Sequence, residues 1–213
     1  MAALILLRHA EPLTSAGVAL GHTDVELSAA GRAQAQALVE TWQGPRPQQI
    51  LCSDLRRARE TLDPLLRAWG MSARYDARLR EMHFGDWEGQ RFDDLAQSDP
   101  ERLAHWYAHW QTEPAPGGES FAELRVRVRA LLAEAQTGPA PLLLCAHAGS
   151  LRAVLVELGH CSPVEAFARP VPYAQAQFWD APAAPGHSAA GYTGQTADGS
   201  VEAWLASASS AGG

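Results

Sequence analysis

The 213-residue sequence predicts an α/β protein, a three-layer α/β/α sandwich built on a mostly parallel sheet. Three short apolar runs, at residues 3–7, 50–52 and 142–146, have the composition of strands that are buried on both faces. Segments with the apolar spacing of helices separate these runs, and strands that alternate with helices build parallel sheets. The sequence contains no internal repeat, so residues 1–213 are expected to form a single domain.

The first half of the chain is expected to contain two strands and two helices. The apolar run at 3–7 is the first strand, and a polar loop over 10–27 follows it. Ser28 belongs to the residue types that cap helix N-termini, and it predicts a helix that runs to about Trp42. The remaining expected elements are the strand at 50–52 and a helix over 54–69, closed by Gly70.

The second half is expected to hold a small helical cap insertion, a third buried strand and a loop-rich C-terminal segment. The insertion covers residues 82–119, with one or two short helices over 92–112 before the chain breakers at 113–118. A helix over 120–135 carries its apolar residues at helical spacing. The other expected elements are a short strand within 73–91, the strand at 142–146, a helix over 150–158, strands near 173–179 and 200–206, a loop over 181–199 and a flexible tail over 207–213.

Composition argues against several classes of protein. The formal charge is −7 and all 17 basic residues are arginines without a basic run, which disfavours nucleic-acid binding. No apolar run approaches the roughly 18–20 residues that span a bilayer, and the first residues do not resemble a signal peptide. The three cysteines have no metal-ligand spacing and indicate a reducing compartment. A cytoplasmic protein is therefore expected, which does not bind membranes.

The residues that carry chemistry follow the predicted strands. Arg8 and His9 come directly after the first strand, and His147 comes directly after the third. The second strand ends at Ser53, with Arg56 and Arg57 at the start of the next helix. Ligand sites of open parallel sheets lie beyond the carboxyl ends of the strands. Two histidines and at least two arginines are therefore expected in one small volume.

Such a cluster suits the transfer of a phosphoryl group. Arginine is always charged and holds phosphate oxygens in a bidentate manner, and a neutral imidazole can act as the nucleophile. Gly149, two residues after His147, opens a helix whose N–H groups favour an anion. His105 and His109 stand four apart, as in some zinc sites, but no third ligand accompanies them. They are interpreted as part of an aromatic helix face, and no metal site is predicted.

The sequence resembles the histidine phosphatase superfamily, also called phosphoglycerate mutase-like, in a series of motifs. In chain order these are LRHAE at 7–11, GHTDVELS at 21–28, CSDLRRARET at 52–61, LREMHFGDWEG at 79–89, GGES at 117–120 and CAHAG at 145–149. Ala10 stands where the family usually has glycine. Pro12, Ser15 and Ala146 also depart from its pattern, yet none of these changes removes a catalytic group.

The resemblance implies a role for each matching residue. His9 is the expected nucleophile, which would form a phosphohistidine, and Arg8, Arg57 and His147 are expected to bind the phosphoryl oxygens. Glu81 occupies the position of the general acid and base. Neither a cofactor nor a metal ion is implied. The expected partner is a small-molecule phosphate ester, and a homodimer is left open. Further substrate-binding candidates are Gly21, His22, Thr23, Ala148 and Gly149.

The insertion bears on the substrate. Residues 82–119 contain eight acidic and two basic side chains, which favours a monophosphate ester with an uncharged or aromatic leaving group. Trp87, Trp106 and Trp110 are predicted to supply a stacking surface for it. Within the superfamily these features resemble the α-ribazole phosphatases, which remove the 5′-phosphate of α-ribazole phosphate during cobalamin nucleotide-loop assembly. The alternatives are a phosphoglycerate mutase, a broad-specificity sugar-phosphate phosphatase, and an inactive binding module on the same fold.

Overall fold

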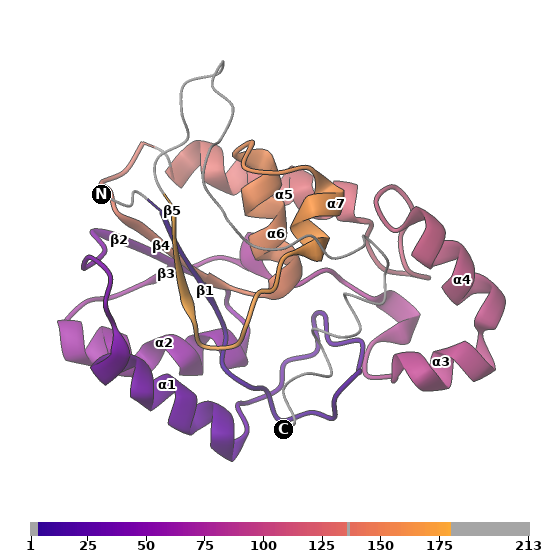
Figure 1. The fold of residues 1–213 in the computed structure, drawn as a ribbon, viewed down its shortest axis with the longest axis horizontal. Coiled ribbons are helices and arrows are strands. Elements are labelled where there is room, and N and C mark those ends of the chain that lie inside the picture. Colours follow the sequence, from indigo (N-terminus) through magenta and orange to yellow (C-terminus); the bar gives the residue numbers. More distant parts are fainter. Residues whose placement is uncertain (1–3, 136, 180–213) are drawn as a thin grey trace.

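A five-stranded sheet lies at the centre of the computed structural model, which describes residues 4–135 and 137–179 (Figure 1). The strand order is β3-β2-β4-β1-β5, and β5 alone runs antiparallel to its neighbour. The predicted mostly parallel α/β fold is therefore confirmed. The strands are β1 (Leu4–Arg8), β2 (Gln49–Cys52), β3 (Arg74–Tyr75), β4 (Leu142–Ala146) and β5 (Ala176–Trp179).

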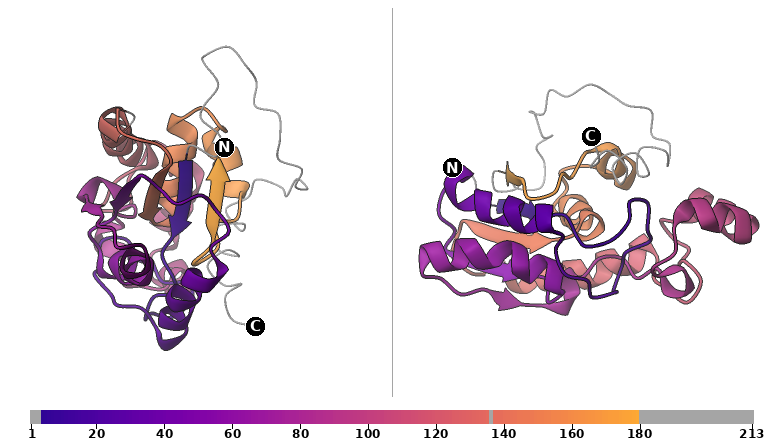
Figure 2. Two further views of the ribbon diagram at one scale, coloured as in Figure 1. Left: turned by 90° about the vertical axis from the view of Figure 1, so that its left-hand side faces the viewer. Right: turned by 90° about the horizontal axis from the view of Figure 1, so that it is seen from below.

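Helices cover both faces of the sheet, as Figures 1 and 2 show. Because side chains of a strand alternate between its faces, β1 directs Ile5 and Leu7 into the core beneath α1 and α2. Its other face directs Leu4 and Leu6 into the core shared with α5 and α6. The helices are α1 (Ala29–Thr41), α2 (Arg56–Trp69), α3 (Phe92–Ser98), α4 (Pro100–His109), α5 (Phe121–Ala135), α6 (Ala148–Glu157) and α7 (Pro163–Ala168), with single 3₁₀ turns at Ala77–Leu79 and Gly85–Trp87.

Two predicted helix boundaries have the expected local chemistry. The Ser28 hydroxyl accepts a hydrogen bond from the Gly31 N–H, so it caps α1. Gly70 ends α2 with φ of 62°, a left-handed conformation that a glycine adopts without steric cost. In the predicted insertion, α3 and α4 lie together at one end of the molecule, away from α1 and α2 (Figures 1 and 2).

The structure corrects the sequence analysis in the C-terminal third. Helix α7 was not predicted, although Ser162 and Glu165 cap each other's backbone N–H groups at its start. Helix α6 begins at Ala148 rather than 150, because His147 serves as its N-cap residue. The last described strand begins at Ala176 rather than 173. The predictions for 181–199, 200–206 and 207–213 lie outside the described residues. Within the described ranges, no helix has the length and apolar character needed to cross a bilayer.

Candidate active site

The carboxyl ends of β1, β2 and β4 bring the predicted catalytic side chains together. Backbone bonds from His9 N–H to Ala146 O and from Ser53 N–H to Cys145 O, both 2.9 Å, continue the strand pairing just past the strands. The rings of His9 and His147 consequently face each other, with 4.9 Å between their centroids. Three segments that are far apart in sequence thus meet at one edge of the sheet, where ligand sites of parallel sheets form.

His9 is held as a neutral imidazole with one defined tautomer. Its Nδ1 lies 2.7 Å from the carbonyl oxygen of Ala10, and a carbonyl can only accept, so Nδ1 carries the hydrogen. The unshared electron pair is therefore on Nε2. Burial lowers the pKa of His9 well below its usual range, and the charges of Arg57 and Arg8 lower it further. A neutral imidazole with a free Nε2 is the form that can attack phosphorus.

His147 and Arg57 orient each other beneath His9. The Arg57 Nε–H donates to His147 Nδ1 at 3.2 Å, so the hydrogen of neutral His147 is on Nε2 and points at the Ser53 hydroxyl, 2.8 Å away. Burial, followed by the Arg57 charge, lowers the pKa of His147 well below its usual range. Both ring nitrogens are thus engaged with protein groups. Sequence analysis placed Ser53 at the end of its strand without assigning it this role.

A socket of backbone carbonyls holds Arg57. Its two Nη groups donate to the carbonyls of Thr23 and Gly21, at 2.8 and 2.7 Å. Burial lowers the pKa of Arg57 to about 10, opposed by the carboxylates of Glu81 and Glu88, and the group stays charged at neutral pH. Each Nη group carries two hydrogens, so one on each remains for a phosphoryl oxygen.

Glu88 holds the loop that forms this socket through hydrogen bonds to its backbone. Its carboxylate accepts from the N–H groups of Gly21, His22 and Thr23 at 3.2, 2.8 and 3.1 Å, and from the Thr23 hydroxyl at 2.7 Å. Burial by itself would raise the pKa of Glu88, but these hydrogen bonds outweigh it, and the pKa is lowered. The N–H and hydroxyl of Thr23 are therefore committed to Glu88. Gly21, His22 and Thr23 thus build the arginine socket, and their predicted contact with substrate stays a prediction.

Glu81 lines the same cleft as His9. Its two oxygens accept from the N–H groups of Met82 and Gly149, at 2.9 and 3.1 Å. Gly149 lies in the first turn of α6, so the start of this helix holds the carboxylate. Arg127, which sequence analysis missed, donates to the backbone carbonyls of Arg80 and Glu81 at 2.9 and 2.8 Å. Hydrogen bonds therefore hold both the side chain and the backbone of Glu81, the residue predicted to act as general acid and base.

Two further side chains that sequence analysis missed line the cleft. Tyr173 lies beside His9, with 5.4 Å between ring centroids. Arg152 on α6 is fully buried and donates to the carbonyls of Ala166 and Arg169, both at 3.1 Å, at the end of α7. Burial lowers the pKa of Arg152 to about 10, and the nearby charge of Arg8 adds to this effect. Arg152 lies on α6 and Tyr173 lies between α7 and β5, so the two residues come together only through packing of the C-terminal segment.

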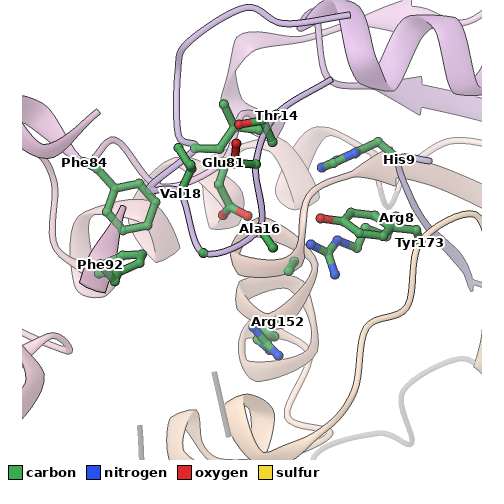
Figure 3. A pocket seen from close by; sticks show the side chains of 14 residues that line it. Arg8, His9, Thr14, Ala16, Val18, Glu81, Phe84, Phe92, Arg152 and Tyr173 are labelled. Carbon is green, nitrogen blue, oxygen red and sulfur yellow. The ribbon is translucent and has the colours of Figure 1, made fainter. Parts of the chain in front are cut away.

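Figure 3 shows the cleft that Arg8, His9, Glu81, Arg152 and Tyr173 line, whereas Arg57 and His147 are not among its lining residues. Its cavity volume is about 80 Å³, room for several waters, and the loop 14–18 forms one wall. Val18, Phe84 and Phe92 make the wall on the side of the cap helices, whereas Arg8, His9 and Tyr173 lie opposite. Leu20 also lines the cleft. Ala148, predicted to bind substrate, also lines the cleft.

Two of the three tryptophans predicted to stack on a substrate are buried, so they present no surface to it, and the role of Trp110 stays a prediction. Trp87 and Trp106 are 1% and 4% exposed and belong to the hydrophobic core. Trp106 packs behind Phe84 and Phe92, at centroid distances of 6.0 and 6.2 Å, and those two rings form the cleft wall. Trp110 packs against Phe121 and Phe167 and does not line this cleft. Trp87 and Trp106 thus support the wall without forming its surface.

Within residues 4–135 and 137–179, no group of three or more His, Cys, Asp and Glu side chains is arranged to hold a metal ion. His105 and His109 stack on each other on α4 at a centroid distance of 4.5 Å.

Comparison with known proteins agrees with this arrangement. Residues 4–178 match the family model of the histidine phosphatase superfamily (branch 1). The chain belongs to the histidine phosphatase superfamily. A glucosyl-3-phosphoglycerate phosphatase of Mycobacterium tuberculosis is 35% identical over 166 residues, which cover 73% of this chain and 74% of that protein. An adenosylcobalamin/α-ribazole phosphatase of Salmonella typhimurium is 32% identical over 73% of this chain and 78% of its own.

Solved structures of histidine phosphatases share the fold. The α-ribazole phosphatase from Shigella flexneri superposes with a TM-score of 0.72 at 31% identity, covering 81% of this chain and 87% of that one. A mycobacterial glucosyl-3-phosphoglycerate phosphatase complexed with VO3 gives a TM-score of 0.74 at 30% identity, with 85% and 100% covered. Since the family model spans most of the chain and these relatives are phosphatases, this histidine phosphatase superfamily member is a phosphatase.

Proposed function

We propose that the protein hydrolyses phosphomonoesters through a phosphohistidine on His9, and that its substrate is α-ribazole 5′-phosphate. The observation that carries the chemistry is the neutral His9 with its free Nε2, set among the charges of Arg8 and Arg57. An imidazole that was protonated at neutral pH would have no electron pair to attack phosphorus. Burial beside two arginines keeps the nucleophile available while these cations attract the phosphate.

The first half-reaction transfers the phosphoryl group to His9. His9 Nε2 forms a bond to phosphorus as the bond from phosphorus to the ester oxygen breaks. A protonated Glu81 gives its proton to that oxygen, so the leaving group departs as an alcohol. Arg8 and Arg57 hold the non-bridging oxygens while charge shifts in line with the breaking bond.

The second half-reaction regenerates the enzyme. Glu81, now a carboxylate, accepts a proton from a water molecule in the space that the alcohol has left. The water oxygen forms a bond to phosphorus, and the bond from phosphorus to His9 Nε2 breaks. Inorganic phosphate leaves, and Glu81 is again protonated for the next ester. No step in this sequence calls for a metal ion or a cofactor.

The choice of α-ribazole phosphate rests on the apolar wall of the cleft. Val18, Leu20, Phe84 and Phe92 contribute apolar side chains to the lining of the cleft that also contains His9. A benzimidazole base is flat and largely apolar, so its contact with this wall would be stabilised by burial and ring packing. The small enclosed volume suits the phosphoryl group itself, which leaves the base to lie along the open mouth of the cleft.

A specific observation also favours a second candidate, glucosyl-3-phosphoglycerate, on which a relative of 35% identity is named to act. Arg152 lines the cleft, and no carboxylate of the described residues lies within ion-pair distance of it. Because Arg8 and Arg57 already match a phosphate dianion, Arg152 adds positive charge that a glycerate carboxylate would complement.

The decisive measurement is kcat/KM for α-ribazole 5′-phosphate, glucosyl-3-phosphoglycerate, 3-phosphoglycerate and p-nitrophenyl phosphate, all with a chelator present. We expect at least a 10²-fold preference for α-ribazole phosphate over p-nitrophenyl phosphate, about 2.7 kcal/mol of discrimination. A preference of this size for glucosyl-3-phosphoglycerate in place of α-ribazole phosphate would select the second candidate. Interconversion of phosphoglycerates that requires bisphosphoglycerate would instead indicate a mutase.

The covalent intermediate is tested with ³²P-labelled substrate. We expect label on the wild-type protein and on His109→Ala, a control for an exposed histidine of α4. His9→Ala should carry no label and have no turnover while it retains the folded circular dichroism spectrum. Turnover by His9→Ala would contradict the proposed nucleophile, and a folded wild-type protein that hydrolyses no ester would indicate a binding module.

A further inference from the structure

Tyr173 lies against both the nucleophile and its neighbouring arginine. Its ring centroid is 3.8 Å from the guanidinium carbon of Arg8, a cation–π contact, and 5.4 Å from the centroid of the His9 ring. Figure 3 shows the hydroxyl end of Tyr173 directed into the cleft, beside Arg8 and on the side of His9. The ring therefore occupies a place from which its hydroxyl reaches the volume of a phosphoryl group on His9.

The backbone holds Tyr173 in this position by an unusual conformation. Ala174, the next residue, has a φ of 48°, which is in the left-handed region that glycine normally occupies. The Ala174 N–H donates to the Arg8 carbonyl at 3.2 Å, and Arg8 Nη1 donates to the Val171 carbonyl at 2.7 Å. A side chain in this region costs on the order of 1 kcal/mol, and such strain is concentrated at functional sites. The segment on both sides of Tyr173 is thus tied to Arg8.

The Tyr173 hydroxyl lies within electrostatic range of Arg57. Burial lowers the pKa of Arg57, and the charge of an ionised Tyr173 is among the charges that oppose this effect. None of the hydrogen bonds between described residues involves that hydroxyl, although it is half-buried. A hydroxyl donor that points into a cationic cleft and has no acceptor there is complementary to an anionic oxygen.

We propose that Tyr173 is a further substrate-binding residue of this phosphatase, whose hydroxyl donates a hydrogen bond to a non-bridging oxygen of the phosphoryl group at His9. The proposal rests on the phosphohistidine mechanism proposed above. No bond to Tyr173 forms or breaks. Because the contact is to the transferred group, it contributes equally for every ester, in contrast to a contact with the leaving group.

The test is Tyr173→Phe, which keeps the ring on Arg8 and removes the hydroxyl alone. We expect kcat/KM to fall about 10- to 100-fold, the range for losing one hydrogen bond to a charged group, by the same factor for α-ribazole 5′-phosphate and p-nitrophenyl phosphate. The dissociation constant of inorganic phosphate, from calorimetry, should rise about tenfold or more. Tyr75→Phe, at an exposed tyrosine of β3, is the matched control and should change neither value.

Tyr173→Leu separates the hydroxyl from the ring. If Tyr173→Phe behaves as wild type while Tyr173→Leu is impaired, the residue acts only by packing on Arg8, and the proposal is wrong. A loss confined to one of the two esters would also overturn it, because the contact would then be to the leaving group. Phosphate binding needs no turnover, so wild-type protein that binds phosphate without hydrolysing esters would defeat the proposed function. The phosphate affinity of Tyr173→Phe would still decide the role of the hydroxyl.

Discussion

Replacing Gly149 by alanine tests how α6 holds the carboxylate of Glu81. The Gly149 N–H donates to Glu81 Oε2 at 3.1 Å, in the first turn of the helix. A methyl group built on Gly149 overlaps Glu81 Oε1 and lies 3.2 Å from its carboxyl carbon, whereas the next neighbour, Leu124, is 3.6 Å away. Because the carboxylate ends a flexible side chain, we expect it to swing aside while α6 stays in place.

The displaced carboxylate affects chemistry far more than stability. Correctly placed acid–base groups contribute about 10²- to 10⁴-fold, so kcat/KM for an alkyl phosphate should fall by 10²-fold or more. p-Nitrophenolate leaves without needing a proton, and its phosphate ester should lose less than about tenfold. Alanine is favoured over glycine inside a helix by about 1 kcal/mol, which offsets the strain of the new contact. The melting temperature should therefore change by only a few degrees.

The assay compares kcat/KM for α-ribazole 5′-phosphate and p-nitrophenyl phosphate in Gly149→Ala and in Glu81→Gln. This ratio reports the step in which the leaving group departs, where Glu81 acts as an acid. Gly149→Ala should reproduce the leaving-group dependence of Glu81→Gln. Unchanged activity on the alkyl ester, or an equal loss on both esters, would refute the assigned contact between Gly149 and the general acid.

Three further predictions follow from the burial and charge of single residues. Glu88→Gln should lower the unfolding free energy by about 2–3 kcal/mol in denaturant titration. The N–H groups of residues 21–23 donate to two carboxylate oxygens of Glu88, whereas the amide of glutamine offers them only one accepting oxygen. Unchanged stability would contradict its role. The lowered pKa values of His9 and His147 mean that the unfolded chain binds more protons below pH 6.5, so stability should fall there by up to about 1.4 kcal/mol per pH unit for each. Two other, partly buried histidines shift in the same direction. A flat profile between pH 6.5 and 5 would be inconsistent with buried neutral imidazoles. Trp106→Ala should lower the unfolding free energy in denaturant titration by about 3–5 kcal/mol, because its ring is core and not cleft surface. Any change in kcat/KM should be the same for all substrates, and a loss confined to one ester would contradict this interpretation.

Much of the fold was predictable because its signals are local. A strand buried on both faces reads as a short apolar run whatever its partners are, and β1, β2 and β4 were found in this way. Ser28 and Gly70 mark helix ends through bonds to residues within a few positions of themselves. Helix α7 was not predicted, because a six-residue helix contains too little periodicity to be recognised.

The sequence by itself determined that His9 and His147 would leave the carboxyl ends of two strands, with arginines nearby. The parallel direction of the strands follows from the alternation of strands and helices, and it places their carboxyl ends at a common edge. The motifs further identified Glu81 and Arg57 as partners of these histidines. All of this depends on the order of residues along the chain, which the sequence contains directly. The strand order, which makes β1 and β4 neighbours, came only from the structure.

Only the tertiary structure decided which side chains face the substrate. Trp106 and Phe84 are aromatic residues of the same insertion, yet the phenylalanine lines the cleft and the tryptophan packs behind it. Tyr173 reaches His9 across a separation of 164 residues, through a backbone turn that no local pattern predicts. The physical reason is that exposure depends on how distant segments pack against each other, whereas secondary structure depends mainly on neighbours along the chain.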